Sequence, residues 1–313
     1  MTLAGIDIGT NTLRLLIAEV QSVQGRVHIR PIFETRRITR LGEGIVNSGR
    51  LAPSAMSRTL QALKEFRAAI SEHPVDRIIG VATSAVREAA NRPLFLDRVK
   101  EETGLNVEVI SGEEEARRTL LGVRYGLEGD NQNLLVIDIG GGSTEWIVVT
   151  GGRVQEMKTV DIGVVKLTDR YLVTDPPSAD DQRQLIQTIE ERFRAMVPSA
   201  GRLSGHRFVG VAGTVTTLAA LELGLKTYDP SRVQKMRLGF ERVEGWYRKL
   251  VGMTLDERRR LAGLERGRED LIVSGTALLW VAMRIAGAKE VMVSDYGLRE
   301  GVLIDWFERN VTR

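Results

Sequence analysis

The sequence predicts an α/β protein built from two similar domains, and three observations lead to this prediction. A short motif occurs twice, as Gly5-Ile6-Asp7-Ile8-Gly9-Thr10-Asn11-Thr12 near the start and as Val136-Ile137-Asp138-Ile139-Gly140-Gly141-Gly142-Ser143-Thr144-Glu145 near the middle. Around each copy, three strands are followed by alternating helices and strands. The chain has 313 residues, of which 42% are hydrophobic and 27% charged. This composition suits about two soluble globular domains, and the repeat indicates an internal duplication.

The first expected element in each half is a hairpin around the motif. The runs that follow the glycines, residues 13–18 and 146–149, are short, apolar and largely of β type. Each glycine turn therefore joins a strand to a strand. A Walker A loop or a dinucleotide-binding loop would instead open a helix.

The remaining elements follow from apolar periodicity and from turn residues. In the first half we expect strands at 27–38, 77–82 and 107–110, helices at 53–71 and 93–102, and a helix that opens at Ser111-Gly112-Glu113. In the second half we expect strands at 134–139, 144–149, 154–160, 208–211 and 291–293, and helices at 164–171, 180–196, 271–285 and 298–307. The chain should cross between the domains near 123–131 and return through the last helix. One domain then holds residues 1–124 plus 299–313, and the other holds 125–298.

The duplicated loops have the composition of phosphate-binding loops. Glycines let backbone N–H groups converge on an anion, and Thr10, Thr12, Ser143 and Thr144 add hydroxyl donors. The Asp at the end of each strand can hold Mg²⁺ directly or through water. The alternative for either copy alone is an ordinary tight hairpin, in which Asp and Gly serve only the turn. Two copies favour the phosphate interpretation, with both loops facing a shared cleft.

Composition excludes several classes of chemistry. The chain has no cysteine and three histidines, which argues against disulfides, zinc chemistry and a phospho-cysteine or phospho-histidine intermediate. A net charge of +3 argues against a nucleic-acid-binding body. We find neither a signal-like N-terminus nor a stretch of about 18 apolar residues, so we expect a cytoplasmic protein with no membrane partner.

Several segments together resemble the exopolyphosphatase/guanosine pentaphosphate phosphatase (Ppx/GppA) family, within the actin, Hsp70 and sugar kinase superfamily. The glycine loops alone would indicate only the superfamily. The family resemblance depends on Ala82-Thr83-Ser84-Ala85-Val86-Arg87 and Ser111-Gly112-Glu113-Glu114-Glu115-Ala116. It extends over nearly the whole length, through the segments Thr39 to Gly44, Gly213 to Thr217 and Ser294 to Gly301.

The resemblance implies a fold and an activity. The fold would be two ribonuclease H-like domains of the actin-like ATPase superfamily that flank a central cleft, in the short two-domain form. The activity would be Mg²⁺-dependent hydrolysis of the terminal phosphoanhydride of inorganic polyphosphate, with Mn²⁺ as an alternative metal. The close alternative is a guanosine pentaphosphate 5′-phosphohydrolase of the stringent response. A homodimer is expected from the family alone.

The resemblance also implies roles for individual residues. Glu115 would be the general base, while Glu113 or Glu114 complements the helix dipole. Asp138 and Glu145 would be the metal-associated carboxylates, and the residues themselves add Asp7 as a further metal candidate. The expected phosphate-binding residues are Thr10, Asn11, Thr12, Arg87, Gly140, Gly141, Gly142, Ser143, Thr144, Gly213 and Thr214.

A site rich in carboxylates also needs cations before it can hold a polyanion. Arg87 is the best candidate, because it is expected at the end of a buried strand, and Arg14 and Lys166 are weaker ones. A basic segment, Arg258-Arg259-Arg260 with Arg266 and Arg268, either guides a polyphosphate chain or forms a solvated helix face.

Two functions of other classes share parts of this pattern. An actin-like ATPase or sugar kinase would need an adenosine pocket near Gly213-Thr214. A polyphosphate or alarmone sensor would bind the same anions without hydrolysing them, and the joint presence of Glu115, Asp138 and Glu145 disfavours it.

Overall fold

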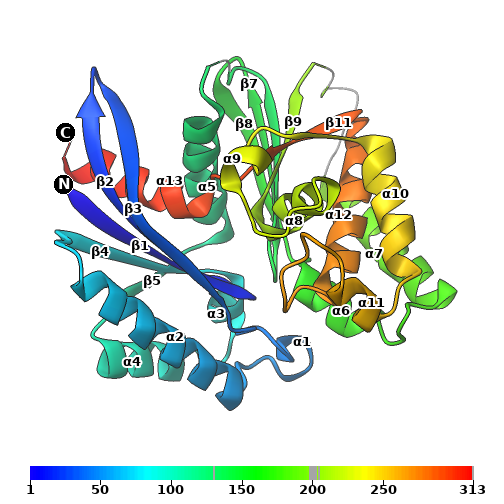
Figure 1. Ribbon diagram of the computed structural model, residues 1–313, viewed down its shortest axis with the longest axis horizontal. Coiled ribbons are helices and arrows are strands. Elements are labelled where there is room, and N and C mark those ends of the chain that lie inside the picture. The colour runs from blue at the N-terminus through cyan, green and yellow to red at the C-terminus, as the bar shows by residue number, and fades with distance from the viewer. Residues whose placement is uncertain (130, 197–202, 204, 312–313) are drawn as a thin grey trace. The chain divides into compact units, whose positions relative to one another are not determined.

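The computed structural model describes residues 1–129, 131–196, 203 and 205–311 (Figure 1). The chain divides into two compact units. The first unit contains Met1–Gly122 and Gly297–Arg313, and the second contains Val123–Tyr296. No helix in the described part of the chain is both long enough and apolar enough to cross a membrane.

The first unit contains a five-stranded mixed sheet with the order β3-β2-β1-β4-β5. Strands β1, β2 and β3 pair antiparallel, whereas β4 and β5 run parallel to β1. The strands are β1 (Thr2–Ile8), β2 (Thr12–Val23), β3 (Arg26–Ile38), β4 (Arg77–Ala82) and β5 (Val107–Val109). The helices are α1 (Ile45–Ser48), α2 (Pro53–Ser71), α3 (Ser84–Glu88), α4 (Arg92–Thr103), α5 (Gly112–Leu127) and α13 (Leu298–Asn310). The last residues of α5, from Val123 on, belong to the second unit.

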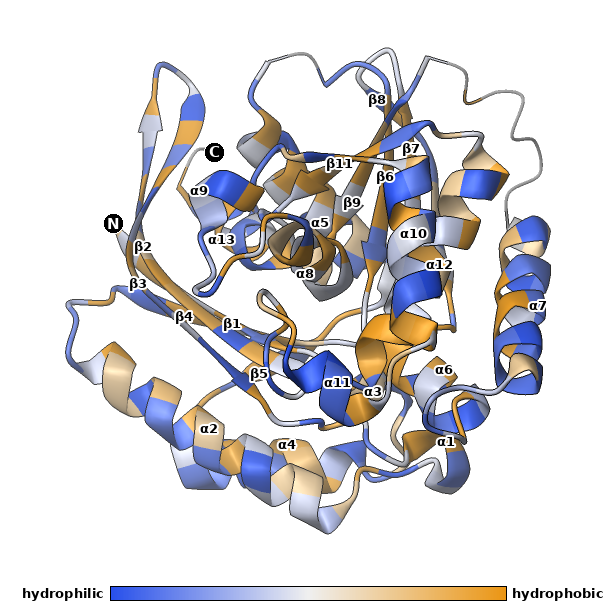
Figure 2. Cartoon of the chain, turned by 45° about the vertical axis from the view of Figure 1, so that its right-hand side comes forward, coloured by the Kyte–Doolittle hydropathy of each residue, from blue (hydrophilic) through white to orange (hydrophobic). Residues whose placement is uncertain are grey.

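Both faces of the β1–β2 hairpin are covered, which explains why these strands are apolar on both sides. The even-numbered β1 residues Ala4, Ile6 and Ile8 belong to the core that includes the apolar positions of α2 and α4. On the opposite face, a Cβ at Gly5 would lie 3.0 Å from Leu303 of α13. Because successive side chains of a strand point to opposite faces of the sheet, Asp7 lies on the same face as Gly5. Figure 2 shows the largely hydrophobic colour of β1 and β2.

The second unit contains a six-stranded mixed sheet with the order β10-β11-β9-β6-β7-β8. It repeats the plan of the first, because the β6–β7–β8 meander is antiparallel and β9 and β11 continue the sheet in parallel. The strands are β6 (Leu134–Ile139), β7 (Thr144–Thr150), β8 (Arg153–Val160), β9 (Arg207–Val211), β10 (Arg237–Gly239) and β11 (Glu290–Ser294). The helices are α6 (Val164–Tyr171), α7 (Ala179–Met196), α8 (Ala212–Glu222), α9 (Pro230–Val233), α10 (Phe240–Val251), α11 (Leu255–Arg259) and α12 (Leu271–Ala286).

The sequence pattern did not predict seven of these elements, namely α1, α3, α8, α9, α10, α11 and β10. Five of them have three to five residues, too few to show a period. Helix α10 is longer, and its buried positions are Val243, Tyr247, Leu250 and Val251. Its aromatic and charged residues have lower intrinsic helix propensity than an alanine-rich segment, so packing against α12 stabilises this helix.

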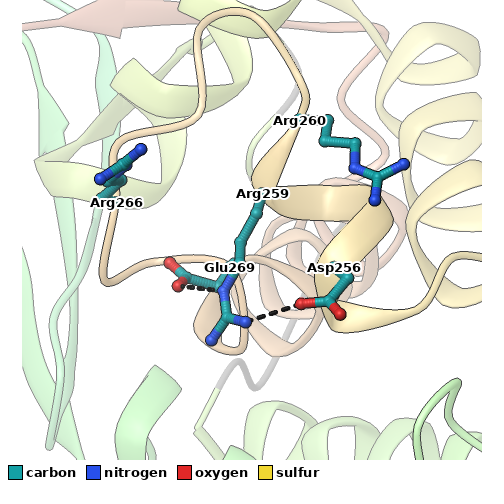
Figure 3. A pocket seen from close by; sticks show the side chains of 5 residues that line it. All are labelled: Asp256, Arg259, Arg260, Arg266 and Glu269. Atoms are coloured by element: carbon teal, nitrogen blue, oxygen red, sulfur yellow. Dashed lines mark hydrogen bonds and ion pairs between the residues drawn. The ribbon is translucent and has the colours of Figure 1, made fainter.

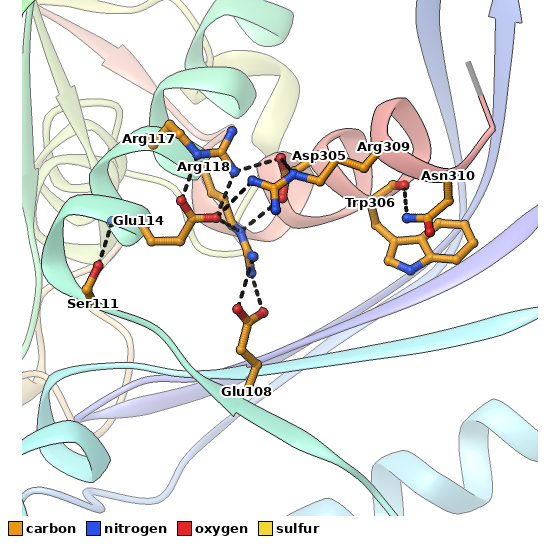
Figure 4. A network of polar contacts seen from close by, with 9 residues as sticks. All are labelled: Glu108, Ser111, Glu114, Arg117, Arg118, Asp305, Trp306, Arg309 and Asn310. Atoms are coloured by element: carbon orange, nitrogen blue, oxygen red, sulfur yellow. Dashed lines mark hydrogen bonds and ion pairs between the residues drawn. The ribbon is translucent and has the colours of Figure 1, made fainter. Parts of the chain in front are cut away.

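A network of buried ion pairs joins α13 to α5 within the first unit (Figure 4). Arg118, which is 5% exposed, donates to Glu114 at 2.8 Å and lies 3.2 Å from Asp305 of α13. Arg117 pairs with the same two carboxylates at 2.7 and 2.6 Å, and Glu108 pairs with Arg118 at 2.9 Å. The helices also approach closely, because a Cβ at Gly301 would lie 1.7 Å from the Arg118 carbonyl oxygen.

Glu114→Gln should reduce stability in a pH-dependent way. The hydrogen bond from Arg117 holds the pKa of Glu114 at about 2, below its ordinary value of 4.5. A carboxylate with a lowered pKa stabilises the fold above its unfolded pKa, and this contribution is lost as the pH falls through the folded pKa. We expect the variant to melt below wild type at pH 6–7, and the difference to vanish between about pH 4.5 and pH 2.

Thermal unfolding followed by circular dichroism across this pH range tests the expectation. Glu113→Gln is the matched control, because Glu113 is exposed in the same helical turn. A melting difference for Glu114→Gln that does not change between pH 7 and pH 3 would show that the ion pair is not the cause.

Candidate active site

The two glycine loops close in the same way, although they lie in different units. In the first unit the Gly9 N–H donates to the Thr12 carbonyl at 3.2 Å, and in the second the Gly140 N–H donates to the Ser143 carbonyl at 3.0 Å. A Cβ at either glycine would lie 2.8 or 2.9 Å from that same oxygen. Each loop joins two antiparallel strands, as the sequence predicts.

The segment after the third strand holds the loop carbonyl groups in both units. In the first unit, the Gly42 N–H donates to Thr10 and the Thr39 N–H donates to Asn11. In the second, the first N–H groups of α6, those of Val164 and Val165, donate to the carbonyls of Gly140 and Gly141 at 3.0 and 2.8 Å. These bonds fix the loops and engage carbonyl oxygens that would repel an anion.

The strands on either side of each loop pair in the same register, but this register places different charged side chains beside the two loops. Asp7 lies opposite Arg14 across β1 and β2, whereas Asp138 lies opposite Glu145 across β6 and β7. Residues directly opposite in an antiparallel pair project from the same face of the sheet. The first loop therefore combines a carboxylate with a guanidinium, and the second combines two carboxylates. Of the two, the second has the character of a cation site.

The donors at the second loop suit Mg²⁺, which takes one or two carboxylates and keeps several waters. Asp138 is 8% exposed at the end of β6. Glu145 is fully buried and accepts a hydrogen bond from the Ser143 hydroxyl at 2.8 Å. The described residues contain no group of three or more His, Cys, Asp or Glu side chains that could hold a metal. This geometry favours Asp138 for contact with the ion, while Glu145 orients Ser143.

The Gly213 segment lies beside Asp138, because Val211 at the end of β9 is the register partner of Asp138. Unlike the two hairpin loops, this segment opens a helix, α8. A Cβ at Gly213 would lie 2.2 Å from Nη1 of Arg268, so this guanidinium covers the glycine. The Thr214 side chain packs against Gly275 of α12, where a Cβ would lie 2.5 Å from the Thr214 hydroxyl oxygen.

The polar residues of the first loop are largely buried. The Thr10 hydroxyl oxygen accepts the Ala85 N–H at 3.2 Å, and the Asn11 amide donates to the Thr12 hydroxyl oxygen at 3.3 Å. Asn11 Oδ1 is buried and has no hydrogen-bond partner among the described residues. Thr10 therefore ties the first loop to the beginning of α3.

Helix α3 also carries Arg87, and the expectation that this residue ends a strand is wrong. Strand β4 ends at Ala82, and residues 84–88 form α3. The Thr83 N–H still bonds the Ile8 carbonyl at the end of β1, and the Arg87 N–H then bonds the Thr83 carbonyl in the first turn of α3. The turn carries Arg87 away from the sheet and toward α5.

Arg87 forms a partly buried ion pair with Glu115. Its Nη1 donates both to Glu115 Oε2 and to the Ile110 carbonyl, at 3.0 Å each. Glu115 is 8% exposed, in the first turn of α5, and its N–H bonds the Ser111 carbonyl. Neighbouring Glu113 is exposed, and Glu114 belongs to the ion-pair network of α13. Of the three glutamates, Glu115 is thus the one held by the arginine of α3.

The weaker phosphate candidates have protein partners. Lys166 of α6 forms an ion pair with Asp161, and Arg14 is the register neighbour of Asp7. Sequence reasoning missed the contact of Arg268 with Gly213 and the close packing of Gly163 under the second loop. A Cβ at Gly163 would lie 2.4 Å from the Gly141 backbone. Long-range backbone contacts of this kind leave no periodic signal in a sequence.

Ala212, next to Gly213, adopts a left-handed backbone conformation with φ of 68°. For a residue with a Cβ this conformation costs about 1–3 kcal/mol. We expect Ala212→Gly to keep or raise the free energy of unfolding, by up to about 1 kcal/mol. Ala212→Val should lower it, because a β-branched side chain is poorly tolerated at positive φ. Urea unfolding of both variants measures the effect, and a glycine variant less stable than wild type would contradict the interpretation.

Comparison with known proteins identifies the family. Residues 16–310 match the model of the Ppx/GppA phosphatase family. The chain is 34% identical to exopolyphosphatase 2 of Mycobacterium tuberculosis over 311 residues, covering 96% of this chain and 97% of the relative. It is 28% identical to a guanosine-5′-triphosphate,3′-diphosphate pyrophosphatase of Photobacterium profundum, covering 98% of this chain but 59% of that protein.

A solved structure has the same fold over almost the whole chain. The crystal structure of an exopolyphosphatase from Cytophaga hutchinsonii superimposes with a TM-score of 0.89 at 30% identity, covering 99% of this chain and 98% of the other. The predicted fold class, α/β with two ribonuclease H-like domains of the actin-like ATPase superfamily, is confirmed in its two mixed sheets. On this evidence the chain belongs to the Ppx/GppA phosphatase family.

Proposed function

We propose that this protein is an exopolyphosphatase, which hydrolyses the terminal phosphoanhydride of inorganic polyphosphate and releases orthophosphate. The observation that carries the proposal is the partly buried pair of Glu115 and Arg87, because hydrolysis requires one oriented base in addition to phosphate-binding groups. The relative with 34% identity and near-complete coverage is named an exopolyphosphatase, which supports the choice of polyphosphate.

In this proposal the glycine loops bind phosphate oxygens through backbone N–H groups. Their carbonyl groups are engaged by the following segment in each unit, which suits an anion-binding loop. Phosphoryl transfer depends mainly on positioning and charge stabilisation, so loops whose geometry is fixed before substrate binds are advantageous.

Glu115 would accept a proton from the attacking water. The water oxygen forms the new bond to the terminal phosphorus, and the bond from phosphorus to the bridging oxygen breaks. The bridging oxygen leaves with its electron pair on the shortened chain, which is already an anion. The contact of Arg87 with Oε2 orients the carboxylate, and the same guanidinium is suited to a phosphate oxygen.

Asp138 would hold Mg²⁺, with Glu145 fixing Ser143 of the loop. When bound, the ion would supply charge compensation for the phosphoryl oxygens. The first loop does not need an ion, because Arg14 lies opposite Asp7 there. We therefore propose Asp138 as the principal metal ligand, and we rank Asp7 behind it.

Two other functions are less compatible with the site. An ATPase or sugar kinase should leave room for adenosine near Gly213, but the Arg268 guanidinium covers this glycine and Thr214 packs on Gly275. A sensor that only binds anions has no need of the buried acidic groups Glu115, Asp138 and Glu145, each of which is costly to keep in a protein interior.

Guanosine pentaphosphate is the second candidate substrate, because a relative at 28% identity is named for that activity. Phosphate release from polyphosphate, guanosine pentaphosphate and ATP, measured side by side with Mg²⁺, distinguishes the candidates. The highest kcat/KM for polyphosphate supports the proposal. Preference for guanosine pentaphosphate would favour the alternative, and preference for ATP would exclude both.

Glu115→Gln should abolish most turnover while binding of polyphosphate persists. Loss of a general base costs about 10²–10⁴-fold in rate. The amide has nearly the same shape as the carboxylate, so the fold should be retained. Glu113→Gln removes the same charge from an exposed position of the same turn and should keep wild-type kcat. Glu115 is not the base if its variant retains activity within a few-fold of wild type.

Asp138→Asn should raise the Mg²⁺ concentration needed for half-maximal activity and lower kcat, because one anionic ligand is removed. Titration of Mg²⁺ against initial rate measures both effects. The control is Asp180→Asn, since Asp180 is an exposed carboxylate in a surface pair with Arg183 on α7. An unchanged Mg²⁺ dependence would leave Asp138 with only a turn-forming role.

A further inference from the structure

The second unit contains a hollow of about 490 Å³ whose five lining residues are all charged: Asp256, Arg259, Arg260, Arg266 and Glu269 (Figure 3). This volume lies within the range of about 300–1,000 Å³ that is typical of small-molecule sites. No aromatic residue lines the hollow, so it offers no surface on which a nucleobase could stack.

The structure sorts the five arginines of this basic segment into different roles. Arg258 is 3% exposed and pairs with Asp175 at 2.7 Å, so it stabilises the fold. Arg268 pairs with Glu265 at 2.9 Å and covers Gly213.

Arg259 neutralises the acidic side of the hollow. It lies between Asp256 and Glu269, at 2.7 and 3.0 Å, and both carboxylates turn toward it in Figure 3. Glu269 also accepts the Gly267 N–H at 2.5 Å. These contacts leave the acidic groups of the hollow already bound to protein donors.

Arg260 and Arg266 are the remaining cations of the hollow. Neither guanidinium forms an ion pair or a hydrogen bond among the residues that the structure describes, and Arg260 interacts with Glu257 only at longer range. Glu257 is itself held by Thr254 in the capping box of α11. Two guanidinium groups that line one hollow can each bind a phosphate through paired N–H donors.

The hollow lies close to the candidate site along the chain. Arg266 is two residues from Arg268, and two residues span at most about 7 Å. Arg268 touches Gly213, which lies two residues after Val211, the register partner of Asp138, so the hollow and Asp138 belong to neighbouring segments of the second unit.

We propose that Arg260 and Arg266 form a subsite for an inner phosphate of the polyphosphate chain, away from the bond that is cleaved. This inference rests on the proposed function and specifies the substrate as a linear polyanion longer than the reacting end. In this proposal the subsite binds a phosphate beyond the third from the end that is cleaved.

The test uses the double variant Arg260→Gln with Arg266→Gln. We expect KM for a long polyphosphate to rise by about five- to thirty-fold, with kcat unchanged, because contacts worth one or two kcal/mol change an equilibrium by that factor. KM for tripolyphosphate should stay at the wild-type value. The difference for the long chain should shrink in high salt, since the contacts are electrostatic and exposed.

The matched control removes the same charge elsewhere in the second unit. Arg194→Gln with Arg248→Gln replaces two arginines that are 72% and 76% exposed on α7 and α10. An equal rise of KM in the control would show a general charge effect and overturn the subsite. A rise of KM for tripolyphosphate in the Arg260/Arg266 variant would also overturn it.

Direct binding separates failure of the subsite from failure of the proposed function. Long polyphosphate is titrated onto the wild-type protein and the two double variants with EDTA present, so that turnover does not interfere. If the wild type releases no phosphate from polyphosphate, the proposed function fails, but weaker binding by the Arg260/Arg266 variant alone still supports the subsite. Equal binding by all three proteins rejects the subsite even where hydrolysis occurs.

Discussion

The candidate site depends on a backbone constraint that occurs in both units. Between the first two strands of each sheet the chain turns so tightly that Gly9 and Gly140 have no room for a Cβ, which would meet a carbonyl oxygen three residues ahead at 2.8 or 2.9 Å. The same closure fixes the register of the hairpin, and the register decides which side chains lie opposite each other. A larger residue would have to shift backbone atoms on which the positions of Asp7 and Asp138 depend.

The two hairpin loops have the same backbone closure but carry different charged side chains, so two similar units can have different binding roles. The pairing of Asp7 with Arg14 balances charge, whereas Asp138 with Glu145 concentrates negative charge. Two like charges directly opposite each other destabilise a sheet unless something compensates for them. The hydrogen bond from Ser143 to Glu145 supplies part of this compensation, and a bound cation would supply more. We therefore expect cation binding to stabilise the second loop more than the first.

The sequence predicts the parts of the fold that depend on local pattern. The bounds of α2, β4, β6 and α6 match the expected ranges, because each combines a clear period with a proline or glycine boundary or a buried apolar run. Arg87 lies in α3 rather than at the end of the strand, and this helix was missed because its five residues are too few to show a helical period. The partner of Glu115 could not be found either, since the Glu115–Arg87 contact exists only after α3 and α5 have packed.

The basic segment shows most clearly what a linear pattern cannot decide. Arg258, Arg259 and Arg260 are consecutive and identical in type, yet one is buried against Asp175, one joins two carboxylates, and one lines a hollow without an ion-pair partner among the described residues. Arg258 and Arg259 end the short helix α11 and Arg260 is its C-cap residue, and successive residues of such a turn point in directions about 100° apart. The basic segment as a whole is therefore neither simply a solvated helix face nor simply a guide for a polyphosphate chain. The burial of each arginine and the carboxylates near it determine its role, and within this segment Arg260 and Arg266 are the arginines that we propose to bind an anion.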